Sequence, residues 1–380
     1  MTLVQSGFDQ ASGCEASLSV ASWRAGLPDA HEWDQLAAGA SEPNPYFEQW
    51  YLRPSLEAFD PAARVRLATL RIDGHLVGLA PLKFAALYYH NPVPHISVWM
   101  HDNTFCGVPL IAPGFESIFW AKLLDWADGH ERKAAVFHLP GLPEGSIPDR
   151  ALEIAMRDSG RTGGMVEREL RAQLASDLPP DTYFEQSLPN KKRKELRRQA
   201  RRLTEIGEIR VDRVASPGDI ALWADRFLTL EAASWKGREG TALANDPAGA
   251  RFFRDSLIGA ARRGRVEGLS LLLDGEPIAM LATFLTPPGA FSFKTTFDER
   301  FARYSPGVLL QKENLALLAR EDIAWCDSCA APDHPMIDHF WREQRAIVSR
   351  NVAIGGRARR ALGARLIAYE SRKLACGTAP

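Results

Sequence analysis

Cysteine is scarce in this chain of 380 residues, and its five cysteines are too scattered to form a disulfide framework. A long apolar run is also missing, since no stretch approaches the roughly 18 consecutive apolar residues that a membrane-spanning helix needs. The first residues show no basic segment followed by an apolar one, so a secretory signal peptide is not expected. These absences predict a cytoplasmic, non-spanning protein with reduced thiols.

The chain also lacks an excess of charge of either sign, because 46 basic and 47 acidic residues leave a net charge of −1. No overall field therefore attracts nucleic acid. Basic residues nevertheless gather in two segments. Residues 191–202 (KKRKELRRQARR) contain eight Lys or Arg in twelve positions, and a second basic segment spans 357–373. Both are expected to form helices with a narrow apolar stripe, the first capped by Asn190.

These two basic segments have several possible partners. They are solvated helix faces in one interpretation. In the others they contact an anionic membrane surface, a phosphate-bearing ligand or RNA. RNA is the least favoured partner because no module of stacking aromatic residues accompanies the charge.

An internal repeat organises the rest of the chain. Asp73-Gly74 and Asp274-Gly275 each separate two runs of alternating apolar residues, which is a strong hairpin signal. Each hairpin follows a helix rich in aromatic residues and precedes a strand and a helix. We therefore predict two divergent copies of one α/β (α+β) unit, each a mixed, largely antiparallel sheet flanked by helices.

The predicted organisation has four parts. They are a disordered leader (1–16), an N-terminal domain (17–180), a C-terminal domain (181–355) and a basic C-terminal helix (356–380). Within them we expect an aromatic helix over 43–59 interrupted at Pro54, a strand over 323–330 and a helix over about 335–345.

The stretch 291–320 carries the clearest signal for a binding site. Alternating apolar residues predict a strand, and Ser305-Pro306-Gly307 predicts a helix start with Ser305 as the cap. We expect this helix to continue to Arg320. The unpaired N–H groups at such a helix start suit an anion such as a pyrophosphate. The alternative is that the three residues only begin a helix.

Several of these residues carry a resemblance to a known family. The segment EAASWKG (231–237), the second Asp-Gly hairpin, FKTTFDERFARYSPGVLL (293–310) and a strand ending at Asp327 resemble the CelD/BcsL-type acyltransferases of the GNAT superfamily. The resemblance covers about 185–350 well and the N-terminal half loosely. That group is related in architecture to the Fem-type transferases, which carry two GNAT-like domains in one chain, in agreement with the internal repeat.

The resemblance implies a donor site for acyl-CoA as co-substrate, with the pyrophosphate on the helix that starts near 304–309. It assigns six residues to cofactor binding: Arg303, Ser305, Gly307, Val308, Leu309 and Lys294. The usual Arg/Gln-x-x-Gly-x-Gly/Ala loop is replaced here by RYSPGV (303–308).

Amide formation from a thioester needs a base for the acceptor ammonium, a donor for the oxyanion and a proton for the departing thiolate. Candidate bases are Asp327 and Glu231, His334 is a candidate proton relay, and Tyr304 is a candidate acid. Each is also interpretable as a satisfied structural polar residue.

Substrate contacts are predicted for five residues: Trp235, Lys236, Trp99, His101 and Phe105. Cys326 and Cys329 have a spacing compatible with zinc, but a strand over 323–330 would turn them to opposite faces. We therefore expect no metal.

The predicted function is acyl-CoA-dependent N-acyl transfer to an amine on a lipid or cell-envelope precursor. The favoured reaction, by resemblance to the bacterial ceramide-synthase type, joins a long acyl chain to a sphingoid-base amine. The alternatives are acyl transfer to an exopolysaccharide sugar, Fem-like transfer from aminoacyl-tRNA, and a non-catalytic GNAT scaffold. The two basic segments predict a peripheral position on an anionic membrane surface, and nucleic acid is not expected as a partner.

Overall fold

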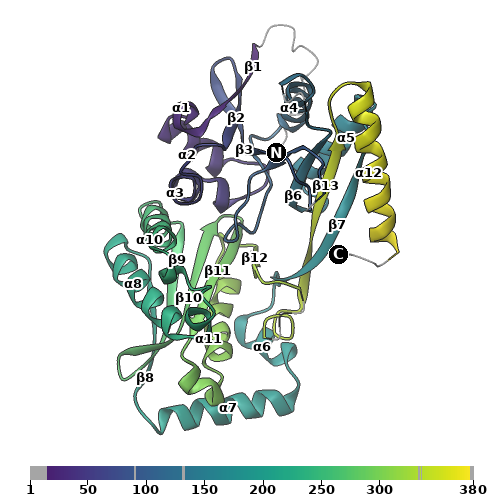
Figure 1. Ribbon diagram of the computed structural model, residues 1–380. Helices are drawn as coiled ribbons and strands as arrows, with labels where there is room; N and C mark the ends of the chain where they lie inside the picture. Colours follow the sequence, from purple (N-terminus) through teal and green to yellow (C-terminus); the bar gives the residue numbers. More distant parts are fainter. Residues whose placement is uncertain (1–14, 90, 131–132, 333, 335, 377–380) are drawn as a thin grey trace, which may run out of the picture.

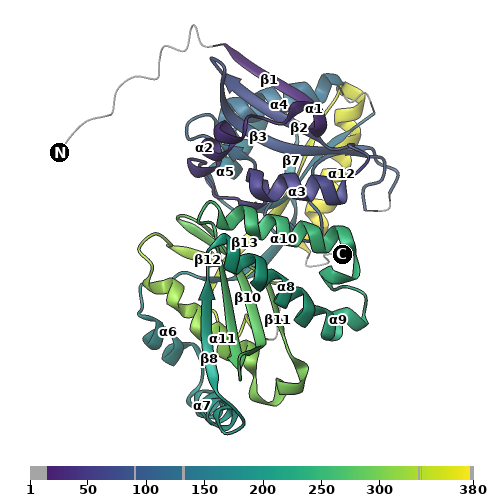
Figure 2. The same ribbon diagram turned by 90° about the vertical axis from the view of Figure 1, so that its left-hand side faces the viewer.

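The computed structural model describes residues 15–89, 91–130, 133–332, 334 and 336–376. Most of the predicted leader lies outside the described residues. The described chain forms one mixed sheet with helices on its faces, as Figure 1 shows, so the predicted fold class is confirmed. Figure 2 shows α8 and α10 in front of the strands of the C-terminal half and α11 behind them.

The sheet contains thirteen strands in the order β1-β2-β3-β4-β6-β13-β7-β12-β11-β10-β9-β8, with β5 paired to β3. The strands are β1 (Ala16–Ser22), β2 (Arg66–Ile72), β3 (His75–Ala85), β4 (His95–Val98), β5 (Leu110–Ile111), β6 (Val136–Pro143), β7 (Gly163–Leu174), β8 (Ile209–Val214), β9 (Val266–Leu273), β10 (Glu276–Thr286), β11 (Gly289–Phe297), β12 (Trp325–Asp327) and β13 (Glu343–Ala353).

The α-helices are α1 (Trp23–Gly26), α2 (Ala30–Ala38), α3 (Gln49–Phe59), α4 (Glu116–His130), α5 (Ile147–Asp158), α6 (Pro180–Ser187), α7 (Asn190–Thr204), α8 (Pro217–Ala233), α9 (Trp235–Arg238), α10 (Pro247–Ala261), α11 (Pro306–Asn314) and α12 (Arg357–Ala375). The 3₁₀ helices are η1 (Pro45–Phe47), η2 (Leu243–Asn245), η3 (Glu299–Tyr304) and η4 (Leu315–Ala319). None of the helices in the described part of the chain is long and apolar enough to cross a membrane.

The internal repeat is visible in both halves. Asp73 and Gly74 have φ angles of 49° and 82°, and Asp274 and Gly275 have 51° and 83°. Two consecutive positive φ angles are those of a type I′ turn, which matches the twist of a hairpin. Each half also contains a parallel pair joined through a helix: β4 with β6 across α4, and β11 with β12 across α11. The predicted order of elements is therefore confirmed.

The two halves exchange strands, which the sequence did not predict. β7, from the N-terminal half, pairs with β12 of the C-terminal half. β13, which lies at the end of the C-terminal half, pairs with β6 of the N-terminal half. β7 and β13 also pair with each other along ten residue pairs, so the sheet is continuous from one half to the other. Neither half has a complete sheet without a strand from the other.

A buried ion pair fixes β13 to the N-terminal half. The Arg350 guanidinium on β13 donates from Nη2 to Asp149 Oδ2 on α5 over 2.9 Å, and also pairs with Glu153 at 2.8 Å. The side chains of Arg350 and Asp149 are 7% and 1% exposed. Removal of one partner from a charge pair this deeply buried strongly destabilises the fold, because the other charge stays buried without a partner.

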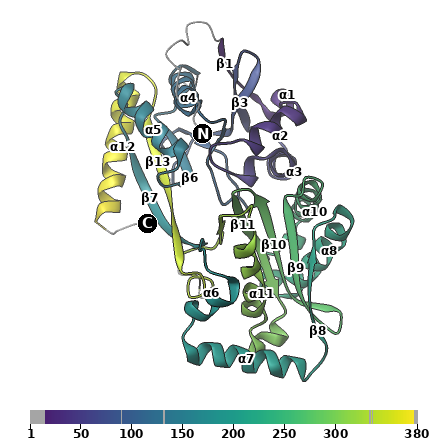
Figure 3. The ribbon, with the colours of Figure 1, turned by 180° about the vertical axis from the view of Figure 1, so that it is seen from behind.

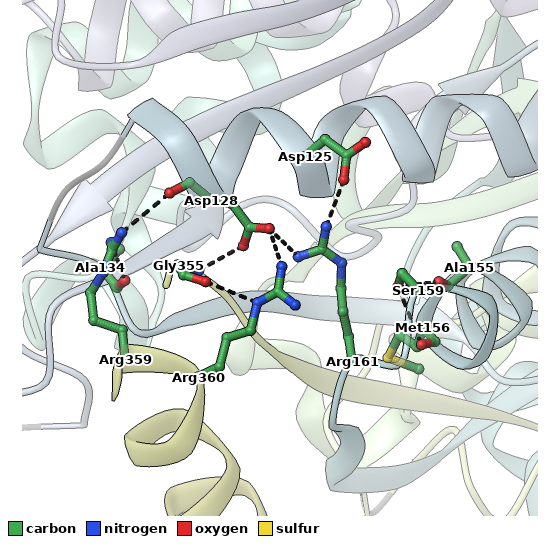
Figure 4. Close-up of polar contacts among 10 residues, drawn as sticks. All are labelled: Asp125, Asp128, Ala134, Ala155, Met156, Ser159, Arg161, Gly355, Arg359 and Arg360. Atoms are coloured by element: carbon green, nitrogen blue, oxygen red, sulfur yellow. Dashed lines mark hydrogen bonds and ion pairs between the residues drawn. The ribbon is translucent and has the colours of Figure 1, made fainter. Parts of the chain in front are cut away.

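Helix α12 is fixed to the N-terminal half at its first turn, as Figure 4 shows. Asp128 on α4 accepts hydrogen bonds from Arg161, Arg360 and the Gly355 N–H. Burial raises the pKa of Asp128, but these donors together lower it below its usual value. Arg359 donates to the Ala134 carbonyl. Arg359 and Arg360 at the start of α12 therefore serve the fold, while exposed residues occur along both halves of the helix.

The local predictions need five corrections. Pro54 lies inside α3, and the break in the aromatic segment comes earlier, between η1 and α3. The strand predicted over 323–330 ends at Asp327, which removes the argument that Cys326 and Cys329 face opposite ways. Residues 336–340 form turns, so the predicted helix over 335–345 is wrong, and Pro335 lies outside the described residues.

The other two corrections concern helix ends. The helix predicted to reach Arg320 changes to 3₁₀ geometry after Asn314. α7 is confirmed as a helix, but Asn190 is its first residue and makes no capping hydrogen bond, because Pro189 occupies the cap position.

Removal of the Arg350 guanidinium tests the role of the exchanged strand. We expect Arg350→Met to lower the free energy of unfolding by about 3–5 kcal/mol, because it leaves Asp149 buried without its partner. Arg168→Met is the control. Arg168 lies on the neighbouring strand β7 and forms a half-exposed ion pair with Glu144, so this change should lower the free energy of unfolding by less than about 1 kcal/mol. Urea denaturation measures both values, and equal effects would contradict the interpretation.

Candidate functional site

A pocket of about 230 Å³ opens where β11 and β12 separate. The two strands pair in parallel only from Gly289 with Trp325 to Phe291 with Asp327. Beyond these pairs β11 continues to Phe297 while the chain after β12 turns away. The pocket is lined by Phe105, Lys236, Ser292, Phe293, Lys294, Thr295, Gln311, Ser328, Cys329, Ala330, Ala331, His334, Met336 and Ile337.

A β-bulge shapes the floor of this pocket. Ala282 on β10 pairs with Lys294, but the next residue, Thr283, pairs with Ser292, so Phe293 is an extra residue. Side chains normally alternate between the faces of a strand, but a bulge redirects them. This explains how four consecutive residues, 292–295, all line one pocket.

Lys294 is one of the two lysines that line this pocket, with Lys236. It is partly buried, and its Nζ lies 5.7 Å from the centre of the Phe105 ring and 5.8 Å from that of Phe293. Within the described residues no carboxylate forms an ion pair with it. Burial, and then the charge of Lys236, lower the pKa of Lys294 to about 8. An amine with this pKa takes up and releases protons near neutral pH.

Glu231 and Lys236 form a structural pair at the edge of the pocket. Lys236 Nζ lies 3.1 Å from Glu231 Oε1 and donates to the Thr295 carbonyl at 3.1 Å. The other carboxylate oxygen of Glu231 accepts from the Leu243 N–H at 3.0 Å. Glu231 is 1% exposed and does not line the pocket. Its predicted role as a base stays a prediction, and its contacts hold α8, α9 and β11 together.

Asp327 is placed behind the pocket wall. It is 1% exposed, accepts a hydrogen bond from the Cys329 N–H at 2.8 Å and lies 3.5 Å from Arg171 Nη1. The same Arg171 nitrogen donates to the Phe105 carbonyl at 2.7 Å. Asp327 therefore supports the pocket through Arg171 and Phe105, and a direct catalytic role for it stays untested.

Cys329 contributes a thiol to the pocket wall. Its Sγ lies 3.1 Å from the hydroxyl of Tyr46, which belongs to the N-terminal half. Burial, followed by the negative charge of Asp327, raises the pKa of this thiol well above its usual value. A thiol that stays protonated is a poor nucleophile. Cys329 is therefore not suited to attack a bound molecule as a nucleophile.

His334 also lines the pocket. Its Nδ1 accepts hydrogen bonds from the N–H groups of Met336 and Ile337 at 3.4 and 3.3 Å. Because a backbone N–H can only donate, these bonds place the ring proton on Nε2. His334 in this state offers a hydrogen-bond donor to the pocket.

A second pocket, of about 290 Å³, lies at the start of α11. Ser305, Gly307, Val308, Lys192 and Met336 line it, and Met336 also lines the first pocket, so the two adjoin.

The start of α11 differs from the predicted anion site in detail. Ser305 has a left-handed backbone (φ 53°) and its side chain makes no capping bond, which corrects the predicted Ser cap. The N–H groups of Val308 and Leu309 both donate to the Ser305 carbonyl. Pro306 has no N–H, so Gly307 supplies the one N–H of this turn without an acceptor among the described residues.

Arg303 and Tyr304 lie outside both pockets. They line a third cavity of about 300 Å³ together with Arg198 and Arg202 of α7. The Arg303 guanidinium stacks 4.8 Å above the Tyr304 ring. Tyr304 is therefore not brought near Lys294 or His334. Leu309 packs in the apolar core beside α11.

The remaining predicted substrate residues are divided between core and surface. Trp99 is 6% exposed and lies 5.4 Å from the His101 ring in the core between the halves. Burial, and then the charge of Lys294, lower the pKa of His101 to about 3, so its ring is neutral. Neither residue lines the pocket. Trp235 is 43% exposed, next to Lys236.

A larger pocket of about 540 Å³ lies elsewhere, between α8 and the loops near 276 and 298–300. Its charged side chains are engaged with one another: Arg226 with Glu276, Arg238 with Glu299, and Arg300 with Asp298. We regard it as a surface groove held by ion pairs.

Ten of the fourteen residues that line the first pocket were not predicted, among them Ser292, Thr295, Gln311, Cys329 and Met336. Gln311 could have been predicted from the sequence, because it follows Gly307 by one helical turn and therefore lies on the same face of the helix. The others depend on the bulge and on irregular backbone, which leave no periodic signal.

Comparison with known proteins gives a family match for part of the chain and a shared fold for most of it. Residues 190–334, less than half of the chain, match a family model described as an acetyltransferase (GNAT) domain. No curated protein sequence matches the chain.

Three solved structures share the fold across nearly their whole length. FemX is 10% identical, with 87% of this chain and 96% of FemX covered and a TM-score of 0.55. A protein of unknown function from Bacteroides thetaiotaomicron is 12% identical, with 86% and 98% covered and a TM-score of 0.55. The C-terminal domain of a protein from Agrobacterium fabrum assigned as a lysylphosphatidylglycerol synthetase is 12% identical, with 91% and 96% covered and a TM-score of 0.54. At these identities the likeness establishes the fold.

The charge of Lys294 should cost stability. In the unfolded chain this amine stays protonated to about pH 10.4, whereas burial lowers its pKa to about 8 in the fold. The free energy of unfolding that is lost by burying the charged amine has its full value below pH 8, and this loss disappears between pH 8 and about 10.5. We therefore expect Lys294→Met to raise the Tm by a few degrees at pH 7, with the gain shrinking toward pH 10.

Lys236→Met is the matched control for this measurement. It leaves Glu231 buried without its partner and should lower the Tm at pH 7. A fall in the Tm of Lys294→Met at pH 7 would show that the Lys294 charge is compensated by a contact that stabilises the fold.

Proposed function

We propose that this chain is a GNAT-type N-acyltransferase that transfers an acyl group from a pantetheine thioester to an amine in the pocket between β11 and β12. The observation that carries the proposal is the Lys294 amine, which lines this pocket without an ion-pair partner among the described residues. The match of 190–334 to a GNAT domain supports the reaction class.

The proposed chemistry moves two protons through Lys294. In its neutral form the Lys294 amine accepts a proton from the acceptor ammonium, and the freed amine attacks the thioester carbonyl. The C–N bond forms and the C–S bond breaks. A proton from the reacting nitrogen passes through Lys294 to the departing thiolate, whose pKa lies close to that of Lys294. Of the two protons that the acceptor nitrogen loses, one ends on the CoA thiol and Lys294 releases the other to solvent, which returns the protein to its starting state.

His334 is proposed as the group that stabilises the oxyanion. Its Nε2–H is directed by the two backbone bonds to Nδ1 and is free to donate when the tetrahedral centre forms. Neutral imidazole is too weak an acid to protonate a thiolate, so we assign it a hydrogen bond and no proton transfer.

The proposed donor is acyl-CoA. Its pantetheine arm would reach the first pocket past Met336, and its phosphates would lie at the second pocket beside Lys192 and the Gly307 N–H. Arg303, with Arg198 and Arg202, supplies positive charge at the third cavity for the remaining phosphate. The apolar lining of the second pocket, from Phe297 and Phe340, suits the arm of the donor.

The proposed acceptor is an amine on a lipid or cell-envelope precursor, with a sphingoid base as the favoured case. The structural similarity to a protein named for lysylphosphatidylglycerol, a lipid, supports this class. A hydroxyl or amine of an exopolysaccharide sugar is the second candidate. Fem-like aminoacyl transfer from tRNA is a third, supported by the fold shared with FemX and by the basic helix α7.

The activity test is release of CoA from long-chain acyl-CoA in the presence of a sphingoid base, followed with a thiol reagent. We expect Lys294→Gln to lower kcat/KM by about 10²–10⁴-fold, the usual contribution of a positioned base. Lys122→Gln, at an exposed position on α4, is the control and should leave the rate unchanged. Loss of activity in both variants, or in neither, would contradict the role of Lys294.

The pH dependence gives an independent check. Because the neutral amine is the active form, kcat/KM should rise with pH and level off above about pH 8. Asp327→Asn should preserve this profile while lowering the Tm. A profile that instead follows a carboxylate, levelling off near pH 5, would transfer the role of base to Asp327 or Glu231.

A further inference from the structure

Exposed aromatic and apolar side chains gather at the tip of β3 and the turn after it. Phe84, Leu87 and Tyr89 are 41%, 59% and 54% exposed, and they lie within a segment of seven residues, 83–89. The segment contains no acidic residue, and it begins with the exposed Lys83. We call residues 83–89 the β3 tip. Large side chains this exposed, and this close together, mark an interaction surface.

The β3 tip is fixed against the C-terminal half of α12. Tyr88, which is buried, accepts a hydrogen bond from Asn351 Nδ2 at 2.8 Å, and the same nitrogen donates to Glu370 Oε2 on α12 at 2.8 Å. The Tyr88 ring also packs 5.3 Å from that of His138. These contacts hold the exposed side chains of the tip beside α12.

The neighbouring face of α12 is cationic and carries apolar groups. Arg365, Tyr369 and Arg372 follow one another at helical spacing and are all exposed, Tyr369 by 62%. Leu362, one turn earlier on the same face, is 55% exposed. The one acidic residue in this part of the helix, Glu370, is directed inward to Asn351.

From this arrangement we propose that the β3 tip and the C-terminal half of α12 form the surface that docks on an anionic lipid bilayer. Aromatic and leucine side chains enter the interfacial layer, while Lys83, Arg365 and Arg372 contact lipid phosphates. The charge is complementary to such a surface, because no outward acidic side chain interrupts it in either segment. A narrow tip of large side chains also suits a soft surface better than the groove or flat patch of another protein.

The orientation of the pocket agrees with this occupant. In Figure 2 α9 and the C-terminal end of α12 both lie in the right-hand half of the view. α9 carries the exposed Trp235, and the next residue, Lys236, lines the pocket between β11 and β12. A bilayer on this side would present a lipid acceptor to the proposed transfer site, and in this respect the inference rests on the proposed function.

The more basic helix α7 does not share these features. Its apolar residues Leu196 and Leu203 are buried, and none of its exposed side chains is a large apolar one. Figures 1 and 3 both show α7 at the far end of the C-terminal half. α7 has the charge for an anionic partner but no group to insert, so we assign the bilayer contact to the β3 tip and α12.

Flotation with lipid vesicles tests the assignment on the full chain. We expect the wild type to float with vesicles of phosphatidylcholine and phosphatidylglycerol but not with phosphatidylcholine alone, and to be released by high salt. Leu87→Ser with Tyr89→Ser should lower the bound fraction about tenfold, and so should Arg365→Gln with Arg372→Gln.

Two matched control variants test whether vesicle binding depends on the β3 tip and α12, or on exposed leucine and positive charge anywhere on the protein. Leu222→Ser removes an equally exposed leucine on α8, and Arg197→Gln with Arg201→Gln removes the same charge from α7. Both should float like the wild type, and all variants should keep the wild-type Tm.

Four results would overturn the proposal. They are a wild type that floats with neither vesicle, tip variants that float like the wild type, controls that lose binding equally, and a wild-type dimer that the tip variants convert to monomer. Loss of binding to an RNA duplex in the same variants, without vesicle binding, would replace the bilayer with a nucleic acid. CoA release with a soluble short-chain amine is measured separately, so failure of the docking surface and failure of the proposed function are distinguishable.

Discussion

The pairing of β7 with β12 is the contact on which the site depends. β12 has only three residues, and it is held between β11 and a strand supplied by the other half of the chain. That strand brings Arg171, which pairs with Asp327 and holds the Phe105 carbonyl at the edge of the pocket. Phe105 belongs to the N-terminal half, so the two halves meet in the wall of the pocket as well as in the sheet. The proposed transfer site is therefore a product of both halves, although its proposed reactive groups come from one.

Lys294 differs from the basic groups around it because it has no ion-pair partner among the described residues. Lys236 is paired with Glu231, and Arg171 with Asp327 and Glu169. Lys294 faces two aromatic rings, and burial and the nearby Lys236 charge lower its pKa toward neutrality. An unpaired amine in a partly buried position lowers the stability of the fold. Such a cost is typical of groups kept for chemistry. The pKa of the Cys329 thiol is shifted away from neutrality instead, since burial raises it and keeps the thiol protonated and inert.

Local and repeated features could be predicted from the sequence. The Asp-Gly turns determine both hairpins, because Asp and Gly tolerate the positive φ angles of a type I′ turn. The spacing of apolar residues predicted β11, and Pro306 predicted the start of α11. His334, Lys294 and Phe105 of the predicted site do line the pocket. The exchange of β7 and β13 could not be predicted from the sequence, because the residue pattern of each strand is the same whichever half it pairs with. The bulge at Phe293 and the left-handed backbone of Ser305 have no counterpart in the spacing of apolar residues, so the sequence pattern does not indicate them.

The central claim is that an acyl thioester reacts beside Lys294 in the pocket where β11 and β12 separate. A crystal structure with a non-reactive thioether analogue of acyl-CoA and an amine acceptor tests it most directly. The account predicts that the acceptor nitrogen lies within about 3 Å of Lys294 Nζ, or is joined to it through one water, with the carbonyl analogue facing His334. An analogue bound elsewhere, with the pocket at Lys294 left empty, would contradict it.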